Sequence, residues 1–311
     1  MSCFSVVFPG QGSQSVGMLA DLYNAYPLVA DIYQEASDVL GYDMDKLINQ
    51  GPEEELAMTS RTQPALLTAS FAVWRVWTYL NGQMPSYMAG HSLGEYSALV
   101  CSGAMSFQDA LRLVETRGKL MQEAVPSGVG AMAAVLGLDN DTVAEGCAQA
   151  AGDQVVSPVN YNAIGQVVIA GHREAVDRAS VILKERGAKK IVPLSVSVPS
   201  HCILMKPASE KLAQVLEDVE IASPVIPVFN NVDVKCEEDP AKIKDALVRQ
   251  LYCPVRWTDI VVAMADAGVE SQLEMGPGKV LTGAVKRIDK RIEGVSVNTP
   301  ATVQELIGVD E

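Results

Sequence analysis

Residues 127–197 interrupt the pattern of the rest of the chain, and this interruption constrains the fold more than any other feature. On either side of it, strand-like and helix-like segments alternate, which favours a largely parallel sheet flanked by helices. Between 127 and 197 the order becomes strand, helix, strand, strand, helix, strand, which is the order of the ferredoxin-like arrangement. We therefore predict an α/β protein in which a ferredoxin-like small subdomain, residues 127–197, is inserted into a larger unit formed by residues 1–126 and 198–311. The junction of two such units is a common place for a ligand cleft.

The positions of the expected elements follow from hydrophobic periodicity and turn residues. In the larger unit the expected strands are residues 5–8, 87–90, 226–230, 270–274 and 294–298, and the expected helices include residues 19–40, 63–80 and 93–103. In the small subdomain the expected strands are residues 128–138, 157–162, 166–170 and 189–198, and the expected helices are residues 141–151 and 174–186.

The bulk composition is that of an ordinary globular protein. The 311 residues are 48% hydrophobic and 20% charged, which is enough chain for a sizeable core. A formal net charge of −14 argues against a nucleic-acid partner, whose footprint is a basic surface. We expect neither a signal peptide nor a membrane partner, because the N-terminus has no basic region and no stretch is long enough to span a bilayer. The six cysteines are scattered without a CxxC pair, which indicates reduced thiols in the cytoplasm and no metal site.

The sequence GHSLG at residues 90–94 indicates a nucleophilic serine. An apolar strand precedes it and a helix follows it, which is the context that a GxSxG motif requires. Glycines two residues to either side of Ser92 relieve the clashes of a sharp turn that exposes the hydroxyl. At a helix N-terminus, the dipole and the free N–H groups also favour negative charge. Ser92 is therefore the predicted nucleophile, with a purely structural turn as the alternative.

A serine nucleophile needs a proton acceptor, and the chain has three histidines. His91 is adjacent to Ser92, so its side chain should leave the turn in another direction. His172 follows a strand and is predicted in a surface turn at a helix start. His201 comes just after the last strand of the small subdomain, where the chain returns to the cleft. By elimination His201 is the predicted base, and a buried histidine with a structural role is the alternative.

No acidic residue convincingly completes the chain order serine, acid, histidine. Asp139, Asp141 and Asp153 lie between Ser92 and His201, but they are predicted to be loop or cap residues of the small subdomain. Either the third partner lies outside that order or it is not a carboxylate. This gap argues against an ordinary α/β-hydrolase.

Arg117 falls on the apolar face of a predicted helix. Ser106 and Asp109 form a capping-box pattern, and the segment should stay helical until Pro126. On an ideal helix Arg117 lies about 20° from the centre of the apolar stripe. A guanidinium there needs a buried anionic partner, since burying an unpaired charge is unfavourable. Arg117 therefore snorkels to solvent, pairs with a structural carboxylate elsewhere, or binds the free carboxylate of a substrate's acyl group bidentately.

Seven segments together resemble the malonyl-CoA:acyl carrier protein transacylases of fatty acid synthesis and, more broadly, the acyltransferase domains of polyketide synthases. They occur in that family's order and approximate spacing: FPGQGSQ, RTQPALLT, GHSLGEYSAL, ETRGKLMQ, SVSVPSHCILM, QLYCPVRW and EMGPG. The resemblance covers nearly the whole chain and implies a hydrolase-like core with a ferredoxin-like insert. It also implies ping-pong transfer of a malonyl group from malonyl-CoA to the phosphopantetheine thiol of acyl carrier protein, through a malonyl-serine.

The resemblance assigns expected roles to individual residues. Ser92 and His201 are the expected catalytic pair, and Arg117 is the expected clamp for the malonyl carboxylate. In the family the histidine is oriented by main-chain carbonyl groups near a glutamine, here Gln250, which would explain the missing acid. Gln63 matches a family position near the active site and is grouped with Arg117 and Gln250 as substrate-binding, without an assigned role.

The glycine-rich loop after the first strand is predicted to be an oxyanion loop. In the family this loop supplies one backbone N–H to the oxyanion hole, here from Gln11, and the second comes from the residue after the nucleophile, here Leu93. Gly10 and Gly12 let the backbone approach the ester oxygen closely. A phosphate cradle fits poorly, because GxGxxG would need glycine at Ser15 and no Walker lysine follows.

The same resemblance implies malonyl-CoA and acyl carrier protein as partners, with CoA as a substrate and no metal or prosthetic group. Carrier proteins of this pathway are acidic, so KERGAKK at 184–190 and KRIDKR at 286–291 are candidate docking patches, with solvated helix ends as the alternative. Three other functions stay open: a serine hydrolase, a non-catalytic acyl-CoA-binding subunit, and a transferase for another acyl group such as methylmalonyl. Residues 198–200 look like the stand-alone malonyl type.

Overall fold

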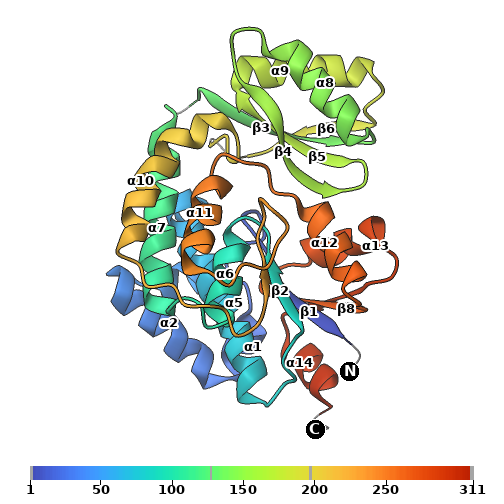
Figure 1. Ribbon diagram of the computed structural model, residues 1–311. Helices are drawn as coiled ribbons and strands as arrows, with labels where there is room; N and C mark the ends of the chain where they lie inside the picture. Colours follow the sequence, from blue (N-terminus) through green and yellow to red (C-terminus); the bar gives the residue numbers. More distant parts are fainter. Residues whose placement is uncertain (1–2, 127, 196–197, 309–311) are drawn as a thin grey trace.

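A five-stranded parallel sheet forms the centre of the larger unit (Figure 1). The computed structural model describes residues 3–126, 128–195 and 198–308. In sheet order the strands are β7 (Val228–Phe229), β2 (Tyr87–Gly90), β1 (Phe4–Phe8), β8 (Ser271–Met275) and β9 (Glu293–Val297). β1 pairs in parallel with β2 and β8, and all five of its residues are buried. A continuous apolar run is what a parallel strand covered on both faces requires.

Helices cover both faces of this sheet (Figure 1). Successive side chains of a strand point to opposite faces, so Val6 and Phe8 of β1 enter one core while Val7 enters another. The helices around the first core include α2 (Pro27–Leu40), α5 (Thr59–Tyr79), α6 (Leu93–Cys101), α7 (Phe107–Ala124), α10 (Lys206–Glu217) and α11 (Pro240–Gln250). The second core contains α12 (Trp257–Asp266) and α13 (Val280–Ile288).

The segment 19–40, predicted as one helix, is two helices, so that prediction was wrong. α1 (Ala20–Ala25) ends before Tyr26, which is extended with φ −127° and ψ 104°, and α2 begins at Pro27. A proline disfavours helical geometry in the residue before it but is well suited to the first helical position. Several shorter elements were not predicted from the sequence. They include α3 (Met44–Gln50), α4 (Glu53–Leu56), the 3₁₀ helix η1 (Ile203–Met205) and α14 (Pro300–Ile307).

The small subdomain has the predicted element order. In chain order the elements are β3 (Gly130–Leu136), α8 (Asn140–Ala151), β4 (Val156–Ala163), β5 (Gln166–His172), α9 (Arg173–Glu185) and β6 (Lys190–Pro193). The four strands form an antiparallel sheet in the order β4, β5, β3, β6. Both predicted limits of this subdomain, residues 127 and 197, lie outside the described residues, as do positions 196 and 197 of the strand predicted at 189–198.

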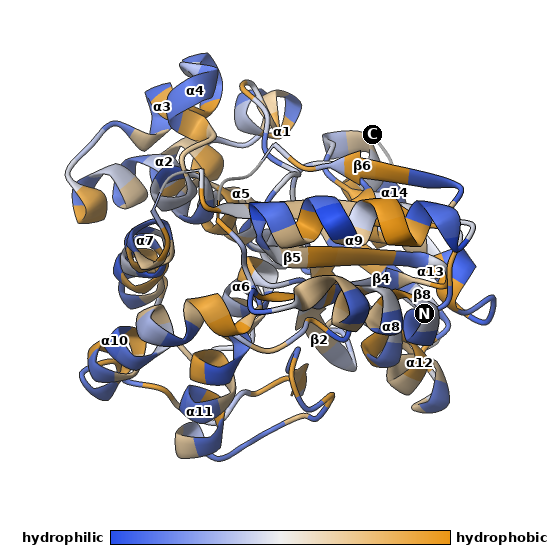
Figure 2. Cartoon of the chain, turned by 90° about the horizontal axis from the view of Figure 1, so that it is seen from above, coloured by the Kyte–Doolittle hydropathy of each residue, from blue (hydrophilic) through white to orange (hydrophobic). Residues whose placement is uncertain are grey.

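One face of the small sheet packs on its own helices and the other faces the larger unit. Ala133 and Val135 of β3 pack in a core with α8 and α9, and β5 is hydrophobic along most of its length where it lies beside α9 (Figure 2). On the opposite face, Met132 clusters with Cys202 of the larger unit. Backbone hydrogen bonds between β4 and Val255 join the two parts. The side chains of one face of β3 therefore reach the junction of the two units.

Within residues 3–126, 128–195 and 198–308, none of the helices combines the length and the apolar character that a bilayer crossing requires.

Candidate active site

Ser92 lies in the tight turn between β2 and α6, as the motif predicts. Its backbone has φ 53° and ψ −106°, a strained combination for a residue with a side chain. A Cβ atom on Gly90 would lie 1.8 Å from the carbonyl carbon of Gly94, and one on Gly94 would lie 2.1 Å from the oxygen of Phe8. No side chain fits at either position, so both glycines are needed to bring strand, turn and helix this close together.

His201 contacts Ser92 directly. Its Nε2 lies 2.8 Å from Ser92 Oγ, and its Nδ1 lies 2.7 Å from the main-chain oxygen of Gln250. A carbonyl oxygen only accepts hydrogen bonds, so Nδ1 carries the proton and Nε2 is free to accept one from the serine. Burial, and then the charge of Arg117, lowers the pKa of His201 to about 3. The imidazole is therefore neutral at physiological pH.

The other two histidines make different contacts. His91 Nε2 lies 2.7 Å from Asn162 Oδ1, and its ring packs beside Trp257. Burial lowers the pKa of His91. His172 accepts a hydrogen bond at Nδ1 from the backbone N–H of Val155 at 2.9 Å. Of the three, only His201 has a hydrogen bond to Ser92 within the described residues.

Arg117 is buried, with 1% of its surface exposed, so it does not snorkel. Its Nη1 donates to Gln63 Oε1 at 2.7 Å, and its Nη2 lies 3.0 Å from Gln250 Oε1 and 3.3 Å from Ser92 Oγ. The guanidinium also lies 5.3 Å from the centre of the Tyr96 ring. No carboxylate of the described residues forms an ion pair with Arg117, and its Nε has no hydrogen-bond partner among them. Neutral amide oxygens thus hold the guanidinium without neutralising its charge.

The loop after β1 forms another wall of the site. Gln11 Nε2 donates to Thr59 Oγ1 at 3.3 Å, and a Cβ atom on Gly10 would lie 2.5 Å from the oxygen of His91. Gly10 therefore allows the loop to lie directly against the turn that carries Ser92. In the described part of the chain, the backbone N–H groups of Gln11 and Leu93 have no acceptor.

These side chains surround a cavity of about 380 Å³ at the junction of the two units. The larger unit contributes residues that include Gln11, Ser92, Leu93, Arg117, Met121 and His201. The small subdomain contributes Met132, Asn160 and Leu194. The predicted cleft at the junction is therefore present. Among the described residues, no group of three or more His, Cys, Asp or Glu side chains could hold a metal ion.

Comparison with known proteins decides the family. The acyl transferase domain model matches residues 5–308. The malonyl CoA-acyl carrier protein transacylase of Salmonella typhimurium is 60% identical over 303 residues, which are 97% of this chain and 98% of the relative. The chain belongs to the malonyl CoA-acyl carrier protein transacylase family. The Escherichia coli transacylase is 59% identical, with the same 97% and 98% coverage.

Solved structures show that the fold is that of the transacylase family. An acyl carrier protein S-malonyltransferase from Vibrio cholerae superimposes with a TM-score of 0.96 at 60% identity, covering 98% of this chain and 100% of that one. A malonyl-transacylase in complex with a type II polyketide synthase acyl-carrier protein superimposes with a TM-score of 0.98 at 58% identity, covering 99% and 100%. The parallel five-stranded sheet with an antiparallel four-stranded subdomain is thus the family's architecture.

Two residues of the transacylase site were missed by sequence reasoning. Asn231 is fully buried; its Oδ1 accepts from Ser92 N at 2.7 Å and its Nδ2 donates to Gly90 O at 2.7 Å. Glu95, on α6, is also buried and accepts from Asn231 N and from Gln250 Nε2. A carboxylate in the middle of the apolar segment that follows Ser92 was the available signal for Glu95. Asn231 gave a weaker one, as a polar residue at the carboxyl end of a strand.

Proposed function

We propose that this chain transfers a malonyl group from malonyl-CoA to the phosphopantetheine thiol of acyl carrier protein, by way of a malonyl ester on Ser92. One observation supports this most strongly. Ser92 Oγ lies 2.8 Å from the His201 imidazole and 3.3 Å from the guanidinium of a buried arginine that has no ion pair among the described residues. A nucleophile, a base and a fixed positive charge therefore share one cavity.

In the first half-reaction, His201 Nε2 takes the Ser92 proton while Oγ attacks the thioester carbonyl carbon. The carbonyl oxygen becomes an oxyanion in a tetrahedral intermediate. Collapse of that intermediate breaks the C–S bond, and the imidazolium gives its proton to the departing CoA thiolate, which leaves as the thiol. The main-chain oxygen of Gln250 holds the imidazole in the required tautomer throughout, since it accepts only from Nδ1–H.

The N–H groups of Gln11 and Leu93 are the proposed oxyanion hole. Both residues line the same cavity as Ser92, and Leu93 is the first residue of α6, where the helix dipole favours developing negative charge. Donors that are fixed in advance stabilise the oxyanion without reorganisation, and losing one typically slows such a reaction by about 10²–10³-fold.

Arg117 is the proposed clamp for the free malonyl carboxylate. Gln63 and Gln250 orient its guanidinium through their side-chain oxygens, which gives Gln63 a role that the sequence did not suggest. The charge of Arg117 contributes to lowering the pKa of His201. A malonyl carboxylate paired with Arg117 offsets that charge, so His201 becomes a stronger base when the correct acyl group is present.

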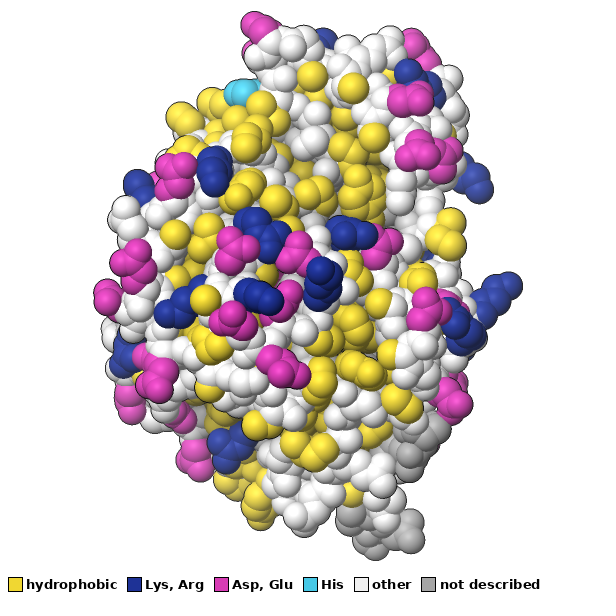
Figure 3. Space-filling view, viewed as in Figure 1, with side chains coloured by type: hydrophobic (Ala, Val, Ile, Leu, Met, Phe, Trp, Pro, Cys, Tyr) yellow, Lys and Arg dark blue, Asp and Glu magenta, His cyan; other side chains and the backbone are white. Residues whose placement is uncertain are grey.

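In the second half-reaction, the carrier-protein thiol attacks the malonyl-Ser92 ester by the same steps in reverse. In each of the two candidate docking patches, one arginine already forms ion pairs with acidic residues of the chain. Arg186 pairs with Glu145, and Arg291 pairs with Asp266 and Asp289. The face shown in Figure 3 carries interspersed acidic and basic side chains, with hydrophobic side chains toward the small subdomain. Lys189 and Lys190 of the first patch are exposed, and so are Lys286, Arg287 and Lys290 of the second, so exposure does not favour either patch.

We propose that residues 127–197 act as a small subdomain that forms one wall of the cleft, with 1–126 and 198–311 as the catalytic unit. We also propose a cytoplasmic location. All six cysteines are free thiols, which fits a reducing compartment.

Initial rates with malonyl-CoA and holo-acyl carrier protein test the proposal. A ping-pong reaction gives parallel lines in double-reciprocal plots, and Ser92→Ala abolishes transfer. Intersecting lines would exclude the malonyl-enzyme. Release of free malonate in place of malonyl-carrier protein would identify a hydrolase, and methylmalonyl transfer at an equal rate would exclude malonyl specificity.

A further inference from the structure

Glu95 is a buried carboxylate behind the nucleophile. Only 2% of its surface is exposed, and it lies on the first turn of α6, three residues after Ser92. Its Oε2 accepts hydrogen bonds from Gln250 Nε2 at 2.8 Å and from Asn231 N at 2.9 Å. Neither the proton transfer nor the oxyanion hole uses this carboxylate, so its burial needs another explanation.

The Gln250 side chain must be held in one of its two possible amide orientations. Its Nε2 donates to Glu95 Oε2 and to Ser92 O, and its Oε1 accepts from Arg117 Nη2. A flipped amide would place two N–H groups against the guanidinium, which has only donors. Oε2 of Glu95 accepts from both of its partners, so it fixes the amide nitrogen on its own side and the oxygen toward Arg117.

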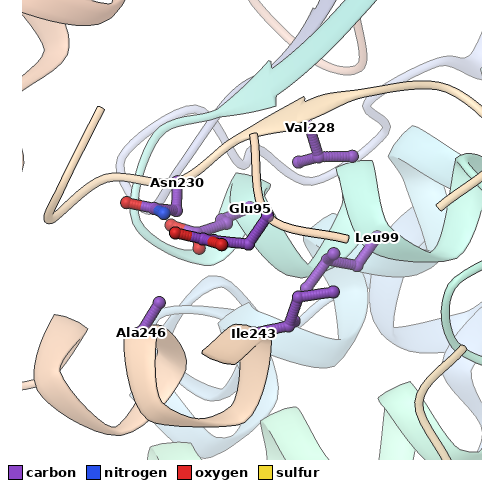
Figure 4. A pocket seen from close by; sticks show the side chains of 7 residues that line it. Glu95, Leu99, Val228, Asn230, Ile243 and Ala246 are labelled. Carbon is purple, nitrogen blue, oxygen red and sulfur yellow. The ribbon is translucent and has the colours of Figure 1, made fainter. Parts of the chain in front are cut away.

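A cavity of about 10 Å³, close to the room that one water molecule needs, lies beside Glu95 (Figure 4). No basic side chain is among the described residues that line it. Besides Glu95 it is lined by Leu99, Val228, Asn230, Glu237, Ile243 and Ala246. Burial raises the pKa of Glu95, and the charge of Arg117 acts on it in the opposite direction. The Gln250 side chain links the two groups, because it donates to Glu95 and accepts from Arg117.

We propose that Glu95 is a positioning residue for malonyl recognition: by holding the Gln250 amide, it keeps the guanidinium of Arg117 aimed at the carboxylate of the acyl group on Ser92. This inference rests on the proposed function. It separates two contributions of Gln250, because the side chain holds Arg117 while the main-chain oxygen holds His201. Loss of Glu95 should therefore disturb the recognition of malonyl more than acyl transfer itself.

The test compares Glu95→Leu, which removes the acceptor, with Glu95→Gln, which keeps an acceptor oxygen. Glu237→Gln is the matched control, because Glu237 lines the same small cavity but has no hydrogen bond to Gln250 among the described residues. The readout is the initial rate of adduct formation on Ser92 with malonyl-CoA and with acetyl-CoA. The melting temperature of each variant is recorded alongside, so that unfolding is recognised.

We expect Glu95→Leu to lower the malonyl rate by about 10- to 100-fold, the range for a displaced binding group, and the acetyl rate by only a few-fold. Glu95→Gln and Glu237→Gln should keep the malonyl-to-acetyl ratio of the wild type within about threefold. The conclusion depends on the ratio of the malonyl rate to the acetyl rate, because this ratio is independent of the folded fraction.

Equal loss of both substrates in Glu95→Leu would overturn the positioning role, and so would a ratio in Glu95→Gln as low as in Glu95→Leu. If the wild type labels Ser92 with malonyl and Glu95→Leu keeps the wild-type ratio, only this inference fails. If the wild type forms no malonyl adduct, the proposed function fails first and this inference with it.

Discussion

His201 donates from Nδ1 to the main-chain oxygen of Gln250 at 2.7 Å. A carbonyl dipole fixes the imidazole tautomer without the full negative charge that a carboxylate would place beside it. The orientation of the base therefore depends on the backbone at the end of α11 and not on a third ionisable side chain. The acid that is missing from the sequence pattern is not needed to orient the base.

Because His201 is held by the main-chain oxygen of Gln250, Gln250→Ala should keep the His201 orientation. The substitution removes the Gln250 oxygen that accepts from Arg117. It also removes the Gln250 nitrogen that donates to the main-chain oxygen of Ser92 and to Glu95. We expect malonyl-CoA kcat/KM to fall by about 10-fold or more and acetyl transfer by only a few-fold. Steady-state kinetics with both substrates measure this. An equal fall would mean that the side chain acts on the base as well.

Arg117→Ala should separate the two acyl groups most clearly. The variant leaves Ser92 and His201 in contact, but it removes the group proposed to pair with the malonyl carboxylate. Hydrogen bonds to a charged group contribute about 1.5–3 kcal/mol each, so the malonyl rate should drop by about 10²-fold or more. Acetyl has no carboxylate, so its rate should change far less. Equal losses would refute the clamp.

Gly94→Ala tests the close packing of the turn against β1. Its Cβ atom would lie 2.1 Å from the oxygen of Phe8, so backbone must shift, and we expect a loss of about 2–3 kcal/mol in the free energy of unfolding. A Cβ atom on Gly283, in α13, would instead point into open space. Gly283→Ala should therefore stabilise the protein by about 0.5–1 kcal/mol. Urea denaturation of both variants decides the point, and similar effects would contradict it.

The pH dependence of stability should report the burial of Glu95. Burial raises the pKa of Glu95 from 4.5 to about 7. A raised pKa means that the folded state binds this proton more tightly than the unfolded state does. The resulting stabilisation is complete below about pH 4.5 and is lost as the pH rises through about 7. Glu95→Gln has no such loss.

From pH 5 to pH 8, Glu95→Gln should therefore gain stability relative to the wild type by on the order of 3 kcal/mol. Urea denaturation of both proteins at several pH values measures the difference, in which the other titrating groups largely cancel. A difference that stays constant across this range would show that Glu95 titrates normally.

The parts of the fold that depend on local pattern could be predicted from the sequence. The apolar run of β1 and the element order of the small subdomain follow from periodicity, and so does the burial of Arg117. The break at Tyr26 was missed because the apolar spacing continues across it, although Pro27 was a readable signal. The strand predicted at 226–230 shortens to Val228–Phe229, since Pro227 has no N–H to donate.

The site was predictable only where a motif or an anomaly marked it. Ser92 lies in a recognisable turn, and Arg117 stands out as a charge on an apolar face. Of the alternatives for Arg117, burial excludes snorkelling and no structural carboxylate pairs with it among the described residues; amide oxygens of Gln63 and Gln250 contact the guanidinium, which the sequence did not indicate. Asn231 reaches the backbone of Ser92 across 139 positions of sequence. Contacts over such distances depend on the sheet order, which single-sequence patterns do not specify.

Intact-protein mass spectrometry after brief incubation with malonyl-CoA tests most directly whether Ser92 forms a malonyl ester. We expect a single malonyl adduct on the wild type, none on Ser92→Ala, and transfer of the adduct to holo-acyl carrier protein when that is added. Absence of an adduct on the wild type, or an adduct that persists on Ser92→Ala, would contradict this expectation.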